Sequence, residues 1–374
     1  MSRQAARMAP TCRPMNDTQQ TDTSLVAAKE KLIVKLGMDV HAAQITVCRQ
    51  DGAGRPQPAR RMSWEQLLAW VGELVASGAE VHSCYEAGPC GYGLHRTLTE
   101  LGVQNLVVAP QRWDERGQRV KTDGRDAREL LDRLDRYLRG NPQVFAVVRV
   151  PTPEQEQRRS LVRQRTALLQ ERNRCTLRGG SLLLGQGFRV PGDWWQLKHW
   201  PRVRTTLPEW LCETVGFWQQ KALHFDTALG ALDQRVAQLS AGKVLIKGLG
   251  RLTDAILESE VLDWHRFQNR RQVASYTGMC PSEYSSGESR QQGAITKHGN
   301  PRVRHHLVEA AWRLELWQPD YAPLRLLREA RGKRARKRAV VAVARHLAID
   351  LWRLATGQTT AEHLRLQVMS TLAA

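Results

Sequence analysis

The sequence lacks the features of a membrane-inserted or secreted protein. No apolar run in its 374 residues is long enough to cross a bilayer as a helix. Residues 1–30 are rich in Ser, Thr and Gln and lack the apolar stretch of a signal peptide, so we expect a flexible leader and a cytoplasmic protein. No lipidation motif accompanies the basic residues, which argues against a membrane surface as the partner.

The cysteines also form no recognisable metal motif. There are seven, an odd number, which fits a reducing compartment. Cys84 and Cys90 are the closest pair, but their spacing matches no zinc motif and no second pair follows. We therefore expect the cysteines to be core or incidental residues.

Positive charge is what the sequence has in excess. Fifty-six Lys and Arg face 37 Asp and Glu, which gives a net charge of +19 and an isoelectric point near 10.2. Such an excess attracts polyanions and makes their binding depend on salt. Nucleic acid is therefore the expected partner.

Strands and helices are expected to alternate over residues 31–150. Three strands with turn residues between them form an antiparallel meander, after which helices and strands follow in turn. This order is that of the α/β ribonuclease H-like fold. We predict strands at 32–40, 44–49, 59–62, 81–86 and 104–109, and helices at 64–76, 91–101 and from about 123 onward.

Four carboxylates occupy the functional end of this predicted sheet. Asp39 ends the first strand, Glu86 ends the fourth, and Asp123 and Asp126 lie in the first turn of the last helix. Oxygen ligands at this spacing suit Mg²⁺ and two-metal phosphoryl transfer. The alternative is that Asp123 caps the helix and Asp126 is a first-turn acid. We interpret His41 as a structural or surface residue.

Two long helices are expected after Pro151. An amphipathic run reaches Leu177 and carries arginines on its other sides, and 218–239 is its predicted partner, within the chain or between subunits. The arginines form either a solvated face or an RNA-facing one. The segment 179–217 between the helices interleaves Trp and Arg; it either stacks on bases or is a small packing insert.

The C-terminal third contains two short loop motifs and a basic cluster. The turn at Gly248 and Gly250 resembles a helix-hairpin-helix element, which would offer amides to a phosphate, or is an ordinary tight turn. The Ser285-Ser286-Gly287 loop either holds a nucleophile or is flexible. The basic residues from Arg331 to Arg338 are typical of a phosphate-contacting patch.

The ordered set of these motifs resembles the insertion sequence 110 family of transposases, the DEDD group of bridge-RNA-guided serine recombinases. The resemblance runs from about residue 33 to 355 and rests on residue types that recur in the family's order. The matching pieces are Gly37-Met38-Asp39, Tyr85-Glu86-Ala87-Gly88, Lys121-Thr122-Asp123 with Asp126-Ala127, Gly248-Leu249-Gly250, Gly278-Met279-Cys280-Pro281, Tyr284-Ser285-Ser286-Gly287 and Thr296-Lys297-His298-Gly299-Asn300.

The resemblance implies a RuvC-like DEDD catalytic domain (31–150) whose four acids bind Mg²⁺. It further implies a coiled-coil segment (151–241, with the Trp-rich insert) that assembles a homo-oligomer, a dimer or tetramer, and a mainly α-helical C-terminal transposase domain (242–374). By motif position the catalytic serine is Ser286, with Ser285 as the fallback.

The implied reaction is cleavage and exchange of DNA strands through a covalent phosphoserine. Donor and target double-stranded DNA and a structured noncoding guide RNA are the implied partners, with base pairing reading the sequence. We expect these residues to contact nucleic acid: Lys121, Arg125, Gly248, Gly250, Arg290, Lys297, Arg302, Arg334 and Lys337.

Two other hypotheses use fewer of these residues. A metal-dependent, structure-specific endonuclease of Holliday-junction type would need the four acids and leave the serine idle. A nucleic-acid-binding protein with a decayed site would need neither. The presence of all five candidate catalytic residues argues against decay.

Overall fold

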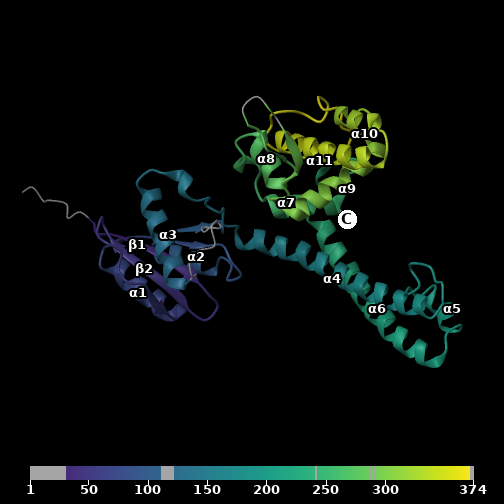
Figure 1. Ribbon diagram of the computed structural model, residues 1–374, viewed down its shortest axis with the longest axis horizontal. Helices are drawn as coiled ribbons and strands as arrows, with labels where there is room; N and C mark the ends of the chain where they lie inside the picture. Colours follow the sequence, from purple (N-terminus) through teal and green to yellow (C-terminus); the bar gives the residue numbers. More distant parts are fainter. Residues whose placement is uncertain (1–30, 111–121, 241, 287–288, 290, 371–374) are drawn as a thin grey trace, which may run out of the picture. The chain divides into compact units, whose positions relative to one another are not determined.

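A five-stranded mixed sheet forms the centre of the N-terminal part of the chain (Figure 1). The computed structural model describes residues 31–110, 122–240, 242–286, 289 and 291–370. The chain divides into two units, Met1–Val150 and Pro151–Ala374. The predicted leader, Lys121 and Arg290 lie outside the described residues.

The sheet of the first unit has the strand order β3-β2-β1-β4-β5. The first three strands are antiparallel neighbours, whereas β4 and β5 run parallel to β1. The predicted order of elements is therefore confirmed, and their ends differ from the predicted ones by at most two residues. The strands are β1 (Ile33–Val40), β2 (Ile45–Asp51), β3 (Arg60–Met62), β4 (Glu80–Glu86) and β5 (Gln104–Val108).

Helices cover both faces of this sheet. α1 (Trp64–Ala76) and α2 (Gly93–Glu100) share one apolar core with β1, and a short 3-10 helix, η1 (Pro142–Val144), follows on the other side. There, α3 (Asp123–Leu138) packs against the sheet through Ala127 and its leucines. Alternate residues of a strand point to opposite faces, so Val34, Leu36 and Met38 of β1 join the first core while Gly37 faces α3.

Gly37 is the point of closest contact between β1 and α3. A β-carbon on Gly37 would lie 2.3 Å from the Ala127 carbonyl oxygen and 2.4 Å from the Leu131 backbone nitrogen. Only glycine permits this approach of two backbones. The contact sets how close α3 lies to the end of β1, where Asp39 is found.

The second unit begins with two long antiparallel helices, α4 (Pro153–Gly185) and α6 (Glu209–Gln238). Ion pairs join them in opposite order along the chain: Arg165 pairs with Asp233, and Arg172 Nη1 lies 2.7 Å from Asp226 Oδ1. The predicted pairing of these helices occurs within one chain. Several predicted solvent- or RNA-facing arginines of α4 are instead paired with acids of the same unit.

The Trp-rich insert forms a small core at the far end of this helix pair. Trp194 and Trp195 are buried there together with residues of α4 and α6, and α5 (Trp200–Arg204) lies between the two helices in sequence. A β-carbon on Gly179 would lie 2.3 Å from the Trp194 ring, so the ring rests directly on α4. Packing is thus the role of these two tryptophans, while Trp210 is half exposed.

The remaining residues of the second unit form a mainly helical core. The buried faces of α9 and α11 meet in its centre. The elements are β6 (Val244–Ile246), α7 (Arg251–Val261), η2 (Trp264–Arg266), α8 (Arg270–Thr277), β7 (Pro281–Glu283), β8 (Gln292–Ile295), α9 (Pro301–Trp317), η3 (Ala322–Leu324), α10 (Arg325–Glu329), α11 (Lys333–Ala355) and β9 (Val368–Ser370).

The prediction of a helix-hairpin-helix element is wrong for the residues that precede the glycine turn. Residues ahead of the glycine turn form β6, which pairs with β9 from the C-terminal end of the chain. A run of β-branched and leucine residues only three long takes the strand state when a partner strand is available. Only α7 follows the turn as predicted.

No helix among the described residues is long and apolar enough to cross a membrane.

Candidate metal centre and nucleophile loop

Asp39 and Glu86 lie side by side at the carboxyl ends of two neighbouring parallel strands. Met38 of β1 is in register with Tyr85 of β4, so the next residue of each strand is an acid. The two strands hydrogen-bond to each other, which fixes this placement from the backbone. The carboxyl ends of such strands are where α/β sheets bind ligands.

Asp123 and Asp126 occupy the first turn of α3, as predicted. The N-cap of this helix is Thr122, and Asp123 is the first helical residue. The alternative prediction, that Asp123 caps the helix, is therefore wrong. The Asp123 side chain is one-third exposed, and Asp126, three residues later in the same turn, is partly buried.

A compact group of three possible metal ligands joins β1 to α3. One ligand atom from each of Asp39, His41 and Asp123 lies within 4.8 Å of the other two. Glu86 is not in this group, but it lines the same cavity of about 620 Å³ as Asp39 and His41. Asp126 lies in the same helical turn as Asp123.

His41 and Arg61 are the neighbours that sequence reasoning did not place in the site. His41 Nε2 lies 3.1 Å from Asp39 Oδ2, although the ring is half exposed as a surface histidine would be. Arg61 Nη2, from β3, lies 3.3 Å from Asp123 Oδ2. The sequence signal for the His41–Asp39 contact was a histidine two residues after a strand-end aspartate. The Arg61–Asp123 contact joins residues 62 positions apart, and no local pattern predicts it.

The donor set fits a divalent cation. Two carboxylates that face each other repel unless a cation or a proton lies between them. Asp39 is mostly buried and Asp123 partly so, which limits screening by water without closing the site. Carboxylate oxygens suit Mg²⁺ and Mn²⁺, and an imidazole nitrogen adds a borderline ligand.

The candidate serines lie in a hairpin of the second unit. β7 and β8 are antiparallel, and Ser286 and Ser289 form an isolated bridge at the tip, with N···O distances of 3.2 and 3.1 Å. The Ser285 hydroxyl donates to Glu283 Oε1 at 2.9 Å. Both serines are exposed.

Two motif loops are joined at the base of this hairpin. The Lys297 backbone N–H donates to the Gly278 carbonyl at 3.0 Å, and the Asn300 N–H donates to the Tyr276 carbonyl at 2.7 Å. A β-carbon on Gly299 would lie 2.4 Å from the Gly278 nitrogen, so both loops need glycine here. The serine hairpin is thereby anchored to the N-terminus of α9.

A buried carboxylate ties α4 to the same loops. Glu260 on α7 is almost completely buried and accepts two hydrogen bonds from Arg163, both at 3.0 Å, and one from Asn300 at 3.0 Å. Burial alone would raise the pKa of this carboxyl, but the hydrogen bonds from Arg163 and Asn300 outweigh burial and hold its pKa below the ordinary value.

The predicted nucleic-acid contacts are mostly exposed basic residues. This holds for Arg125 and for the remaining described side chains, which are Lys297, Arg302, Arg334 and Lys337. The glycine turn is more enclosed, because Arg313 Nε donates to the Gly248 carbonyl at 3.0 Å. Gly250 is exposed and directly precedes α7.

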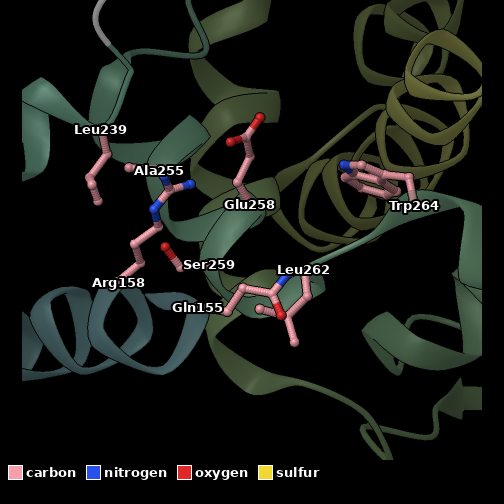
Figure 2. Close-up of a pocket in the computed structure, with 8 residues that line it drawn as sticks. All are labelled: Gln155, Arg158, Leu239, Ala255, Glu258, Ser259, Leu262 and Trp264. Atoms are coloured by element: carbon pink, nitrogen blue, oxygen red, sulfur yellow. The ribbon is translucent and has the colours of Figure 1, made fainter. Parts of the chain in front are cut away.

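A smaller cavity of about 180 Å³ lies among α4, α6 and α7 (Figure 2). Its lining combines the apolar side chains of Leu239, Leu262 and Trp264 with Arg158 and Glu258. None of the predicted site residues lines it. We therefore place the candidate site at the sheet edge, in the larger cavity.

The fold and the acids together indicate a class of enzyme. A mixed α/β domain with carboxylates at the strand ends, joined to a helical part, is typical of DEDD enzymes that process DNA. Family models agree: residues 36–186 match the DEDD transposase model of the IS110 group, and residues 245–323 match the model described as Transposase IS116/IS110/IS902 family.

Individual relatives extend the match over most of the chain. The protein y4rJ of Sinorhizobium fredii is 35% identical over 302 residues, which is 72% of this chain and 75% of that protein. The transposase for insertion sequence element IS1111A of Coxiella burnetii is 26% identical over 87% of this chain and 90% of that protein. The chain belongs to the IS110 family of insertion-sequence transposases.

The fold is consistent with a RuvC-like DEDD transposase, and membership in this family implies a divalent metal ion and action on DNA.

Proposed function

We propose that this transposase exchanges DNA strands through a covalent phosphoserine on Ser286, with chemistry assisted by a metal ion that Asp39, Glu86, Asp123 and Asp126 bind. The observation that carries the proposal is the convergence of Asp39 and Asp123, 84 positions apart in the chain, into one ligand group. Glu86, at the end of the neighbouring strand, lines the same cavity.

The chain's own residues supply most of the proposed chemistry. The Ser286 oxygen attacks a DNA phosphorus, a phosphorus–oxygen bond to deoxyribose breaks, and the leaving oxygen takes up a proton. A deoxyribose hydroxyl of the new strand then attacks the phosphoserine and restores the serine, which conserves the phosphodiester energy. A bound divalent cation, Mg²⁺ in this proposal, would help to neutralise charge that develops on the phosphate oxygens.

Ser285 is the second candidate for the nucleophile. Its hydroxyl is oriented by Glu283, whereas the Ser286 backbone closes the tip of the hairpin. The position of the serine directly before Gly287 in the family motif favours Ser286. Separate alanine variants of the two serines distinguish them.

We propose double-stranded donor and target DNA and a structured guide RNA as partners. The net charge of +19 and the exposed side chains of Arg125, Lys297, Arg302, Arg334 and Lys337 support contact with phosphates. In this scheme the protein contacts backbones, and pairing of the RNA with DNA selects the sequence. RNA guidance rests on the family resemblance.

We propose a homo-oligomer, a dimer or tetramer, assembled through the α4–α6 pair. Large apolar side chains are exposed at seven-residue spacing on both helices: Leu177 and Leu184 on α4, and Trp210 and Phe217 on α6. This spacing is typical of a helix seam that packs against another helix. The division of the second unit into a coiled-coil segment (151–241) and a C-terminal transposase domain (242–374) is part of the same proposal.

Covalent trapping tests the phosphoserine directly. The full-length protein is incubated with its flanking RNA, labelled donor and target DNA and Mg²⁺, then denatured and resolved by electrophoresis. We expect a shifted protein–DNA band that is lost in both Ser286→Ala and Asp123→Asn. Ser285→Ala is the matched control and retains the band if Ser286 is the nucleophile.

A junction endonuclease is the second candidate function. The ligand group lies wholly within the first unit, which favours it as a self-contained metal site. Cleaved DNA without any adduct, unchanged in Ser286→Ala, would establish this function and exclude serine recombination.

A further inference from the structure

We propose that His41 is a direct ligand of the metal ion held by Asp39 and Asp123, and that its nitrogen makes this position prefer Mn²⁺ to Mg²⁺. The inference rests on the proposed function, because it concerns the same metal centre. It adds a fifth residue to the four acids and changes the chemical class of ion that the centre selects.

The ring nitrogen of His41 is part of the ligand group and does not merely lie beside it. One atom of each residue is within 4.8 Å of the other two, and Nε2 is 3.1 Å from Asp39 Oδ2. Two ligands of one ion lie at most about 4.2 Å apart, since each is about 2.1 Å from the ion. Small side-chain rotations close the remaining difference.

The backbone of His41 is fixed by the turn between β1 and β2. Its N–H donates to the Gln44 carbonyl at 3.0 Å, and its carbonyl accepts from the Trp64 indole N–H at 3.1 Å. These bonds hold the residue on the cavity wall beside Trp64. The ring therefore reaches the Asp39 carboxylate without any change in the backbone.

A second Asp-x-His pair in the chain shows what distinguishes a ligand from a local contact. His265 Nδ1 lies 3.3 Å from Asp263 Oδ1, a similar distance at the same sequence spacing. Asp263 there caps the short helix η2. Among the residues that the structure describes, only the His41 pair is joined by a third ligand residue, Asp123. A third ligand residue from a helix distant in sequence, Asp123 of α3, is what distinguishes the His41 pair as a binding site.

A nitrogen ligand changes which ion binds best. Mg²⁺ is a hard ion that prefers oxygen ligands, whereas affinity for imidazole rises along the first-row transition metals. Carboxylates alone accept both Mg²⁺ and Mn²⁺. The addition of His41 should therefore strengthen Mn²⁺ binding and leave Mg²⁺ binding almost unchanged.

Paramagnetic resonance of the Mn²⁺-loaded, full-length protein tests the proposal without any activity assay. Free Mn²⁺ is measured by its spectrum to obtain the affinity, and electron spin-echo modulation detects ¹⁴N bound to the ion. The variants are His41→Asn, the matched control His265→Asn, and Asp123→Asn. Folding of each is checked by circular dichroism.

We expect ¹⁴N modulation in the parent protein and in His265→Asn, and none in His41→Asn. His41→Asn should weaken Mn²⁺ binding about tenfold and Mg²⁺ binding, measured by competition, by less than about twofold. Mn²⁺ bound in an Asp123-dependent manner without ¹⁴N modulation would overturn the role of His41 and leave the proposed metal centre standing. Failure of both ions to bind would overturn the inference together with that centre.

Discussion

Replacement of Gly37 by alanine should push α3 away from β1 and so separate the ligands of the metal centre. The added β-carbon would lie 2.3 Å from the Ala127 carbonyl oxygen and 2.8 Å from Leu131 Cα, and its three nearest neighbours are all backbone atoms of α3. Side-chain rotation cannot relieve such contacts. Restoring ordinary van der Waals separation requires α3 to move from β1 by roughly 1 Å.

The energetic consequence follows from this displacement. Overpacking of a tight core costs about 1–3 kcal/mol, and we expect the upper end because backbone has to move. The same movement carries Asp123 away from Asp39. Binding sites tolerate displacements of about 0.5 Å, so Mn²⁺ affinity should fall about tenfold.

Hydrogen exchange measured by mass spectrometry reports on the two units separately, which a single unfolding curve would not. Peptides of β1 and α3 should exchange faster in Gly37→Ala. Gly72→Ala on α1 is the matched control: its β-carbon meets nothing within 4 Å, so it should stabilise the helix by about 0.5–1 kcal/mol. Unchanged exchange and unchanged Mn²⁺ affinity in Gly37→Ala would refute the reasoning.

Three further predictions concern the second unit. Glu260→Gln should lower the free energy of unfolding by about 2 kcal/mol at pH 7, whereas Glu258→Gln, two residues away and partly exposed, should change it little. Because the Glu260 pKa is lowered in the folded protein, the difference from the parent should shrink as the pH falls below the ordinary carboxyl value of 4.5. A denaturant titration read out by hydrogen exchange of the α4 and α7 peptides, at pH 7 and at pH 4, measures this for the second unit alone, and a constant difference would contradict it. Burial, the neighbouring His305 and nearby arginines lower the pKa of His306 to about 4. Between pH 6.5 and pH 4 the unfolded chain therefore binds a proton that the folded chain does not, so the free energy of unfolding decreases as the pH is lowered. His306→Gln should flatten this dependence in the same titration. Gly299→Ala should destabilise the serine hairpin and abolish the covalent adduct, and a normal adduct yield would show that the loop contact is dispensable.

Local patterns in the sequence were sufficient for most elements of the first unit. The helix at 64–76 has the predicted ends because Ser63 and Gln66 form a capping box at its start. The strand-end positions of Asp39 and Glu86 followed from alternating elements, since the carboxyl ends of parallel strands meet at one edge. The acids of the candidate site were therefore available from the chain alone.

Contacts between distant segments were not available from local patterns. The sequence left the α4 arginines as a solvated or RNA-facing surface, but Arg172 meets Asp226 and Arg163 meets Glu260, partners that only helix pairing brings together. β6 formed in place of a helix because β9 supplies its hydrogen bonds from more than 120 residues away.

The sequence by itself determined the order of elements, the positive charge and the positions of the acids, because propensity, periodicity and composition act over a few residues. Only the tertiary structure decided that Asp123 joins Asp39 and His41 and that Arg61 lies against Asp123. Both of these contacts depend on how β1, β3 and α3 pack, and the approach of α3 to β1 depends on the bare backbone of Gly37.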